Sequence, residues 1–193
     1  MSTIQLNHTF FCWTDASWKT SFANKLKKEE WAVKTWLKDI LQLNWFDLNL
    51  PFEEYFQLEM EYVKNSVWNL VFDRCSIDFL VYNLLMIQLN SDEGIWEYIV
   101  DQKYGDFLTN FVAKNWPSNV IYLSTSFDVL KKRMNSRDII SNFDKLLLNS
   151  PETFSLYKWL FEMVVVKLKK ENIKQAENQR LLISHIDTSK SVL

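Results

Sequence analysis

Lys19 and Thr20 are the two residues whose types and position point most directly to chemistry. They follow the loop Trp13–Trp18, which itself follows an apolar run at 8–12. This spacing is that of a phosphate-binding P-loop, G-x-x-x-x-G-K-[ST], in which the lysine neutralises phosphate charge and the hydroxyl binds Mg²⁺. The sequence therefore predicts ATP and Mg²⁺ as cofactors, with Lys19 as a catalytic residue and Thr20 as a metal ligand. The predicted nucleotide-binding positions are Trp13, Thr14, Asp15, Ala16, Ser17, Trp18, Lys19 and Thr20.

Tryptophan occupies both positions of this loop that require glycine. Glycine permits a positive φ and leaves the backbone N–H groups open to phosphate oxygens, whereas an indole at Trp13 or Trp18 obstructs both. The chain contains nine Trp and two Gly, although a domain of this length is expected to carry about 13 Gly. Two explanations stay open. Either UGA codons for glycine have been decoded as tryptophan, or the tryptophans are genuine and the P-loop has decayed.

Asp73 and Arg74 end a second apolar run, Asn69–Phe72. A carboxylate at the end of a strand can hold a Mg²⁺-bound water, and a guanidinium can bind a phosphate through two parallel hydrogen bonds. We therefore predict that Asp73 is a catalytic residue and metal ligand and that Arg74 binds substrate. The alternative is a structural salt bridge between the two side chains.

Arg133 and Arg137 are four residues apart within Asp128–Asp138, which places them on one face of a helix. In phosphoryl transfer, arginines on a mobile segment can stabilise the charge of the transition state and close over ATP. We predict both as catalytic residues. A solvated helix face is the alternative interpretation.

Apolar runs that alternate with amphipathic stretches indicate how these residues are positioned. The pattern predicts a three-layer α/β fold in one domain over 1–193, with a mostly parallel five-stranded sheet and helices on both faces. Parallel strands end at the same edge, so the P-loop and Asp73 are expected to meet there. The predicted strands are 8–12, 69–72, 119–124 and 180–186, with a short fifth at 32–35. The predicted helices are 17–30, 37–43, 52–66, 76–90, 95–114, 126–136 and 151–178.

Composition argues against nucleic-acid and membrane partners. The net charge is −2, and the richest basic run, Lys167–Lys170, is typical of a solvated helix face. The apolar run 163–166 is too short to span a bilayer, and the first residues lack the apolar core of a signal peptide. These features predict a cytoplasmic protein.

The cysteines and histidines are interpreted as structural. Cys12 and Cys75 lie in or just after predicted core strands, which favours buried free thiols over a disulfide or a cysteine-ligated metal. His8 opens the first strand and His185 lies within the last, and neither has a neighbour at metal-ligand spacing.

Taken in order, the segments resemble the P-loop nucleoside and nucleotide kinases, such as thymidylate kinase and the deoxynucleoside kinases, and related small ATPases labelled AAA. Residues 13–23 resemble the opening loop, and 71–82 resemble the Asp-Arg segment that holds the acceptor's phosphate or sugar. Residues 120–133 are similar to the strand and lid helix, and 186–191 to the final strand and adenine-side loop. The resemblance implies strand order 2-3-1-4-5 and Mg²⁺-ATP-dependent phosphoryl transfer to a nucleoside or nucleoside monophosphate.

Two departures keep other functions open. Deoxynucleoside kinases carry a catalytic carboxylate after the second strand, but Ala32–Trp36 offers none, so Asp73 is the substitute candidate. The tryptophans at 13 and 18 favour, as alternatives, a non-catalytic pseudokinase or a generic P-loop ATPase. A small-molecule substrate is expected, and a homodimer is one possible assembly.

Overall fold

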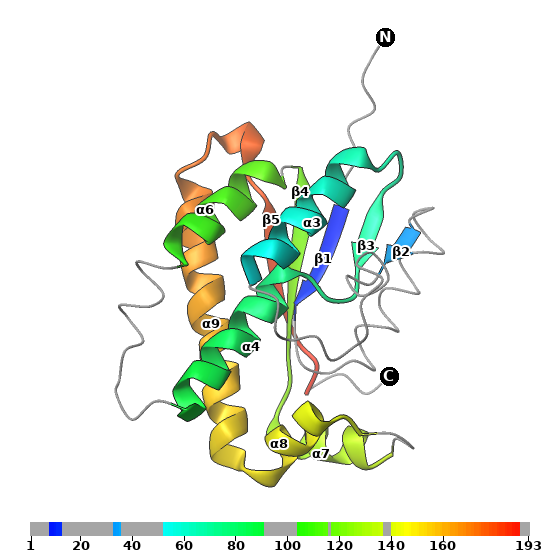
Figure 1. Cartoon of the computed structure of the whole chain (residues 1–193), viewed down its shortest axis with the longest axis vertical. Helices are drawn as coiled ribbons and strands as arrows, with labels where there is room; N and C mark the ends of the chain where they lie inside the picture. The colour runs from blue at the N-terminus through cyan, green and yellow to red at the C-terminus, as the bar shows by residue number, and fades with distance from the viewer. Residues whose placement is uncertain are drawn as a thin grey trace.

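The computed structural model of this chain describes residues 8–12, 33–35, 52–90, 104–115, 117–136 and 140–189 (Figure 1). These residues form strands, α-helices and one short 3-10 helix. The strands are β1 His8–Cys12, β2 Val33–Thr35, β3 Leu70–Phe72, β4 Ser118–Ser124 and β5 Leu182–Asp187. The helices are α3 Phe52–Asn65, α4 Ser76–Asn90, α6 Gly105–Lys114, α7 Phe127–Asn135, α8 Asn142–Asn149, α9 Pro151–Ile173 and η2 Glu177–Gln179.

The strands form a parallel sheet in the order β2-β3-β1-β4-β5. Phe10 lies beside Phe72, Cys12 beside Tyr122, and Ser124 beside Asp187. Because every pair is parallel, all strands end at the same edge, which we call the carboxyl edge. The order is the one that the kinase resemblance implied.

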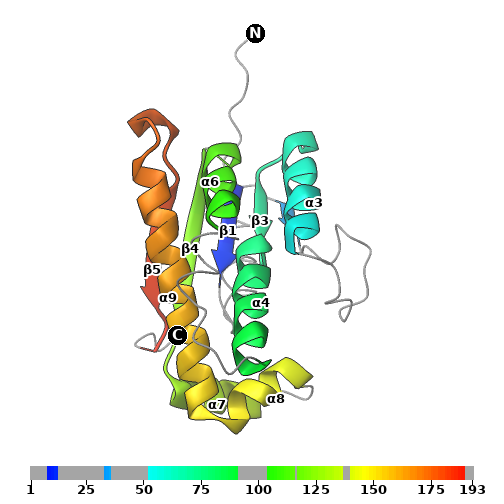
Figure 2. The ribbon, with the colours of Figure 1, turned by 60° about the vertical axis from the view of Figure 1, so that its left-hand side comes forward.

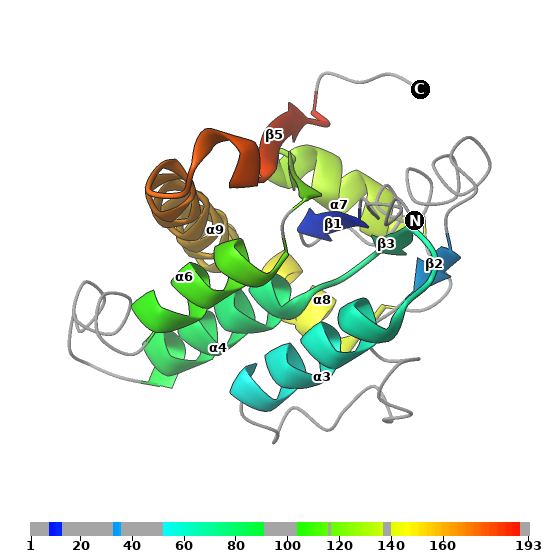
Figure 3. The same ribbon diagram turned by 90° about the horizontal axis from the view of Figure 1, so that it is seen from above.

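The layers follow from the connections between parallel strands. Helices α3, α4, α6 and α9 lie on one face of the sheet when the molecule is viewed from above (Figure 3). Helices α7 and α8 lie beyond the carboxyl edge (Figures 1 and 2). The helix predicted at 17–30 lies outside the described residues, as does the one at 37–43. The parallel α/β architecture is confirmed, and helical cover of the second face stays a prediction.

Aromatic packing joins the sheet to its helices. Phe10 stacks on Phe72 with ring centroids 4.7 Å apart and meets the edge of Phe111 from α6 at 5.4 Å. On the neighbouring strand β4, Tyr122 stacks on Phe161 of α9 at 5.9 Å. All five residues of β1 are buried, as expected for a strand between two neighbours in a parallel sheet.

Local signals explain where the elements differ from expectation. Helix α8 was not expected, and its first residues form a capping box in which the N–H of Asp144 donates to Ser141 Oγ at 3.1 Å. The long helix ends at Ile173 rather than at 178. The reason is that the Asn172 side chain donates to the Leu181 carbonyl and accepts the Leu181 N–H. Among the described helices, none combines the length and apolar character needed to cross a membrane.

Candidate functional site

The carboxyl edge brings together segments that are far apart in the sequence. Cys12 ends β1, Asp73 follows β3, and Thr125 follows β4. The turn after β5 is fixed to β4, since the N–H and the hydroxyl of Thr188 both donate to the Ser124 carbonyl at 2.8 Å. The hydroxyl of Thr125 is buried and has no hydrogen-bond partner among the described residues.

Asp73 and Arg74 lie where the sequence predicted, directly after β3. Asp73 is 1% exposed, whereas Arg74 is half-buried. The charge of Arg74 affects the pKa of Tyr157 on α9. Burial raises the pKa of Tyr157, the nearby carboxylates of Asp78 and Asp144 add to this, and the Arg74 charge opposes it. The Arg74 charge therefore acts on Tyr157, whose ring also contacts Phe143 of α8.

The buried carboxyl group of Glu59, on α3, binds the first residue of α4. Glu59 accepts hydrogen bonds from the Ser76 N–H at 2.8 Å and the Ser76 hydroxyl at 2.7 Å. Burial raises the pKa of Glu59 to about 8, assisted by the Asp78 carboxylate and opposed by the two Ser76 hydrogen bonds. Glu59 is therefore mostly protonated at neutral pH. The sequence did not predict Glu59 as a functional candidate, because only its contact with α4 distinguishes it from the other glutamates of α3.

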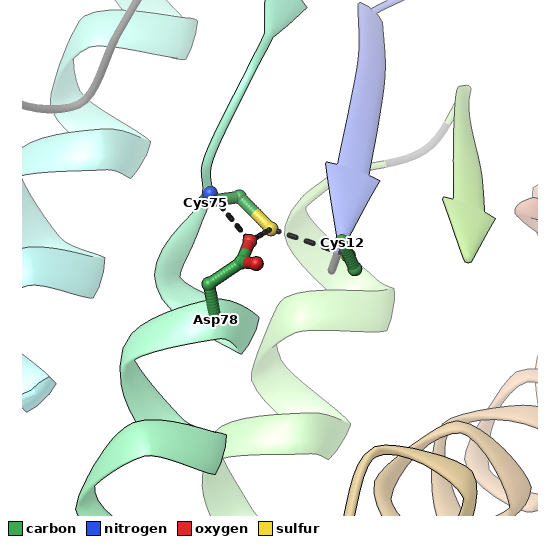
Figure 4. Close-up of side chains that lie close together, drawn as sticks. All are labelled: Cys12, Cys75 and Asp78. Carbon is green, nitrogen blue, oxygen red and sulfur yellow. Dashed lines mark hydrogen bonds between the residues drawn. The ribbon is translucent and has the colours of Figure 1, made fainter. Parts of the chain in front are cut away.

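Next to this carboxyl group, two thiols and a second carboxylate converge (Figure 4). Cys12 Sγ and Cys75 Sγ are 3.4 Å apart. Asp78 Oδ2 lies 3.6 Å from Cys75 Sγ and accepts the Cys75 N–H at 3.0 Å. Both cysteines are buried free thiols, as predicted. Burial raises the pKa of Cys75, with further contributions from Cys12, Asp78 and Glu59.

Arg133, for which the resemblance implied a place on a lid helix, has a partner that the sequence did not predict. Arg133 on α7 donates from its two terminal nitrogens to Thr188 Oγ1 at 3.1 Å and to the Thr188 carbonyl at 2.9 Å. In this arrangement its guanidinium holds the turn after β5. Its predicted contact with transferring phosphate stays a prediction, and Arg137 lies outside the described residues.

Both histidines make contacts between strands of the sheet. His8 Nδ1 accepts the N–H of Leu70 at 3.2 Å, and burial lowers the pKa of His8. His185 Nε2 shares a 2.7 Å hydrogen bond with Ser124 Oγ, and its ring stacks on Tyr122 at 4.7 Å. These contacts agree with the structural interpretation of both residues.

The predicted P-loop, residues 13–20, lies outside the described part of the chain, so the roles of Lys19 and Thr20 stay predictions. The residue directly before the start of this loop is nevertheless described. Cys12 directly precedes the loop, and Cys75 follows the Asp73-Arg74 pair. The 3.4 Å approach of the two sulfurs shows that the chain entering the loop lies beside the Asp-Arg segment.

The parallel sheet with its order β2-β3-β1-β4-β5 has a counterpart among solved structures. Among solved structures, this chain is similar to a deoxyadenosine kinase from M. mycoides that was determined with bound dCTP. The similarity covers 97% of this chain and 92% of that chain, with 18% sequence identity and a TM-score of 0.50. No protein-family model matches the sequence, and no curated protein matches it.

Proposed function

We propose that this protein transfers the γ-phosphoryl group of Mg²⁺-ATP to a small acceptor, a nucleoside or a nucleoside monophosphate. The observation that carries the proposal is the convergence of the chain entering the P-loop with Asp73 and Arg74 at the carboxyl edge of a parallel sheet. Open α/β sheets bind ligands at this edge. The similarity to a deoxyadenosine kinase over nearly the whole chain supports the same reaction class.

Bound Mg²⁺-ATP would supply the phosphoryl group, and the Mg²⁺ would neutralise its charge. Two features of the described edge suit these groups. Asp73 is a buried carboxylate, and carboxylate oxygens are ligands that Mg²⁺ prefers. The Thr125 hydroxyl is buried without a partner among the described residues, which leaves a donor for a ligand. In the proposal Lys19 binds the β- and γ-phosphates and Thr20 joins Asp73 at the metal.

The acceptor is assigned to the region around Arg74, where α4, α8 and α9 approach one another. Tyr82, Phe143 and Tyr157 form a row of ring contacts there, with centroids 5.0 Å and 5.3 Å apart. The partly exposed rings of Tyr82 and Phe143 suit the base of a nucleoside, whereas Tyr157 is buried. The Arg74 guanidinium suits a phosphate or sugar oxygen. In this arrangement the acceptor binds beside ATP rather than in its place.

Replacement of the two loop tryptophans tests the nucleotide site. The double variant Trp13→Gly and Trp18→Gly should bind ATP at least tenfold more tightly, about 1.4 kcal/mol, because the loop backbone becomes free to wrap the phosphates. Calorimetry measures the affinity, and a panel of nucleosides and nucleotides identifies the acceptor through ADP release. In that background Lys19→Ala should abolish turnover without loss of the fold. Unchanged ATP affinity in the double variant would contradict the proposed site.

A non-catalytic nucleotide-binding module is the second candidate, and the tryptophans at 13 and 18 favour it. This module would keep the fold and lack turnover even with both glycines present. The gene separates the two explanations of the loop, since UGA at codons 13 and 18 indicates glycine and UGG indicates tryptophan. A generic P-loop ATPase, the third candidate, would release ADP without an added acceptor. A cytoplasmic location and a homodimer stay proposals, and sedimentation in solution tests the latter.

A further inference from the structure

The group formed by Cys12, Cys75 and Asp78 has no role in the phosphoryl transfer proposed above. All three side chains are at least nine-tenths buried, at 0%, 0% and 7% exposure. They come from three different segments, namely the end of β1, the loop after β3 and the first turn of α4 (Figure 4). A buried convergence of two sulfurs and a carboxylate needs an explanation of its own.

Helix capping explains only part of the arrangement. Asp78 accepts the N–H of Cys75, the residue before α4, at 3.0 Å. Asp144 makes the equivalent contact with the N–H of Ser141 before α8 at 3.3 Å, and it is also buried. The α8 cap works with a serine and no cysteine. Capping therefore accounts for the carboxylate but not for the two thiols beside it.

Two of the separations between the three ligand atoms are close to those of a tetrahedral metal site. With Zn–S bonds of about 2.3 Å and a Zn–O bond of about 2.0 Å, tetrahedral geometry separates two sulfurs by about 3.8 Å and a sulfur from an oxygen by about 3.5 Å. The observed separations are 3.4 Å for the two sulfurs and 3.6 Å for Cys75 Sγ and Asp78 Oδ2. The three ligand atoms all lie within 4.8 Å of one another.

We propose that Cys12, Cys75 and Asp78 bind one thiophilic divalent cation of the Zn²⁺ type, which ties β1, the loop after β3 and α4 together at the carboxyl edge. Two thiolates and a carboxylate are donors that select such a metal over Mg²⁺. The three side chains leave one tetrahedral position for water or another ligand. Each thiol releases its proton to solvent as its sulfur binds the metal, so binding strengthens as pH rises.

Cobalt is the probe for this site, because Co²⁺ bound to thiolates gives a charge-transfer band. Reduced, chelator-treated full-length protein is titrated with Co²⁺ in the absence of nucleotide. We expect one Co²⁺ per chain with a thiolate charge-transfer band, displacement by Zn²⁺, and a higher melting temperature with Zn²⁺. Since no nucleotide is present, the result is independent of the proposed kinase activity, and either proposal can fail alone.

Two matched variants connect the signal to these residues. Asp78→Asn should weaken Co²⁺ binding at least tenfold, whereas Asp144→Asn, which alters the equivalent cap on α8, should bind Co²⁺ as the wild type does. Cys12→Ser and Cys75→Ser should lose the charge-transfer band while circular dichroism shows a folded chain. If a serine variant does not fold, the two asparagine variants carry the test.

Three results would overturn the proposal. The first is a folded, reduced wild type that gives no charge-transfer band. The second is an Asp78→Asn variant that binds Co²⁺ as tightly as the wild type. The third is a Cys12–Cys75 disulfide whose reduction yields a protein without metal affinity, which would make the two thiols a redox pair.

Discussion

At the scale of single residues, the candidate site depends on what two arginines bind. Arg74 follows a buried strand, and its charge opposes the rise that burial causes in the pKa of Tyr157 on α9. Arg133 is on a different helix and holds Thr188 through two hydrogen bonds. The two guanidiniums therefore belong to different parts of the carboxyl edge, and their substitution should affect different steps.

Arg74→Lys should raise the KM for the acceptor and lower kcat/KM by about tenfold or more, with little change in ATP affinity. The substitution keeps the charge but loses the planar fork that binds two oxygens at once. Steady-state kinetics with the glycine-restored loop measures the acceptor parameters, and calorimetry measures ATP binding. Equal losses for ATP and acceptor, or an effect on melting temperature alone, would make Arg74 a structural residue.

Arg133→Ala should lower kcat in the same background and leave the KM for ATP nearly unchanged, because a lid arginine contributes mainly in the transition state. Thr188→Val is the matched control, since it removes the hydroxyl partner while keeping the arginine, and it should not reduce kcat. A higher KM for ATP in both variants would show instead that Arg133 acts by holding the turn after β5.

At the scale of elements, the joint between α3 and α4 is sensitive to pH. Glu59 has a folded-state pKa of about 8, above the value of about 4.3 expected in the unfolded chain. Between these values the folded protein binds more protons than the unfolded one. The free energy of unfolding should therefore decrease as pH rises from about 4.3 toward 8 and level off above the folded pKa.

Glu59→Gln should flatten this dependence, because glutamine keeps an acceptor for the Ser76 N–H but does not ionise. Urea unfolding at a series of pH values between 5 and 9 measures the effect. Glu54→Gln, on the exposed part of the same helix, is the control and should retain the slope. An identical slope in wild type and Glu59→Gln would contradict the assignment.

A second prediction at this scale concerns the N-terminal cap of α8. Ser141→Ala should destabilise the protein by about 1 kcal/mol, because the Asp144 N–H loses its acceptor at the helix start. Ser155→Ala, at an exposed position within α9, removes a hydroxyl without a cap and should change stability by less than about 0.5 kcal/mol. Thermal unfolding compares the two variants.

At the scale of the whole molecule, stability comes from helices packed on the sheet. Phe161 of α9 is fully buried between Tyr122 of β4 and Tyr157. Phe161→Ala should cost about 3–5 kcal/mol, since it leaves a cavity between helix and sheet. Trp159→Ala on the same helix removes a larger ring that is 46% exposed, and it should cost far less. Denaturant unfolding of both variants measures the contrast.

Much of the fold could be predicted from local patterns. The continuous apolar runs at 8–12 and 69–72 predicted buried parallel strands, because only a strand covered on both faces tolerates such a run. The same pattern placed Asp73 and Arg74 at the end of β3, where the structure has them. The helices at 52–66 and 76–90 were predicted to within one residue of α3 and α4. Local order along the chain is enough for these conclusions.

The short helix α8 and the end of α9 could not be predicted in this way. Helix α8 has eight residues and a capping box rather than a long apolar period. The end of α9 is fixed by Asn172, whose side chain binds Leu181 nine residues further along. These features depend on hydrogen bonds between segments, and hydrophobic periodicity does not record them.

The sequence by itself determined the class of fold and the chemistry expected at one edge of its sheet, since both follow from residue type and spacing. Only the tertiary structure decided which side chains meet there. It brings Cys12 to Cys75, 63 positions away, Glu59 to Ser76, and Arg133 to Thr188. The physical reason is that strand order and helix packing, which are set by burial of the whole core, fix contacts between distant segments.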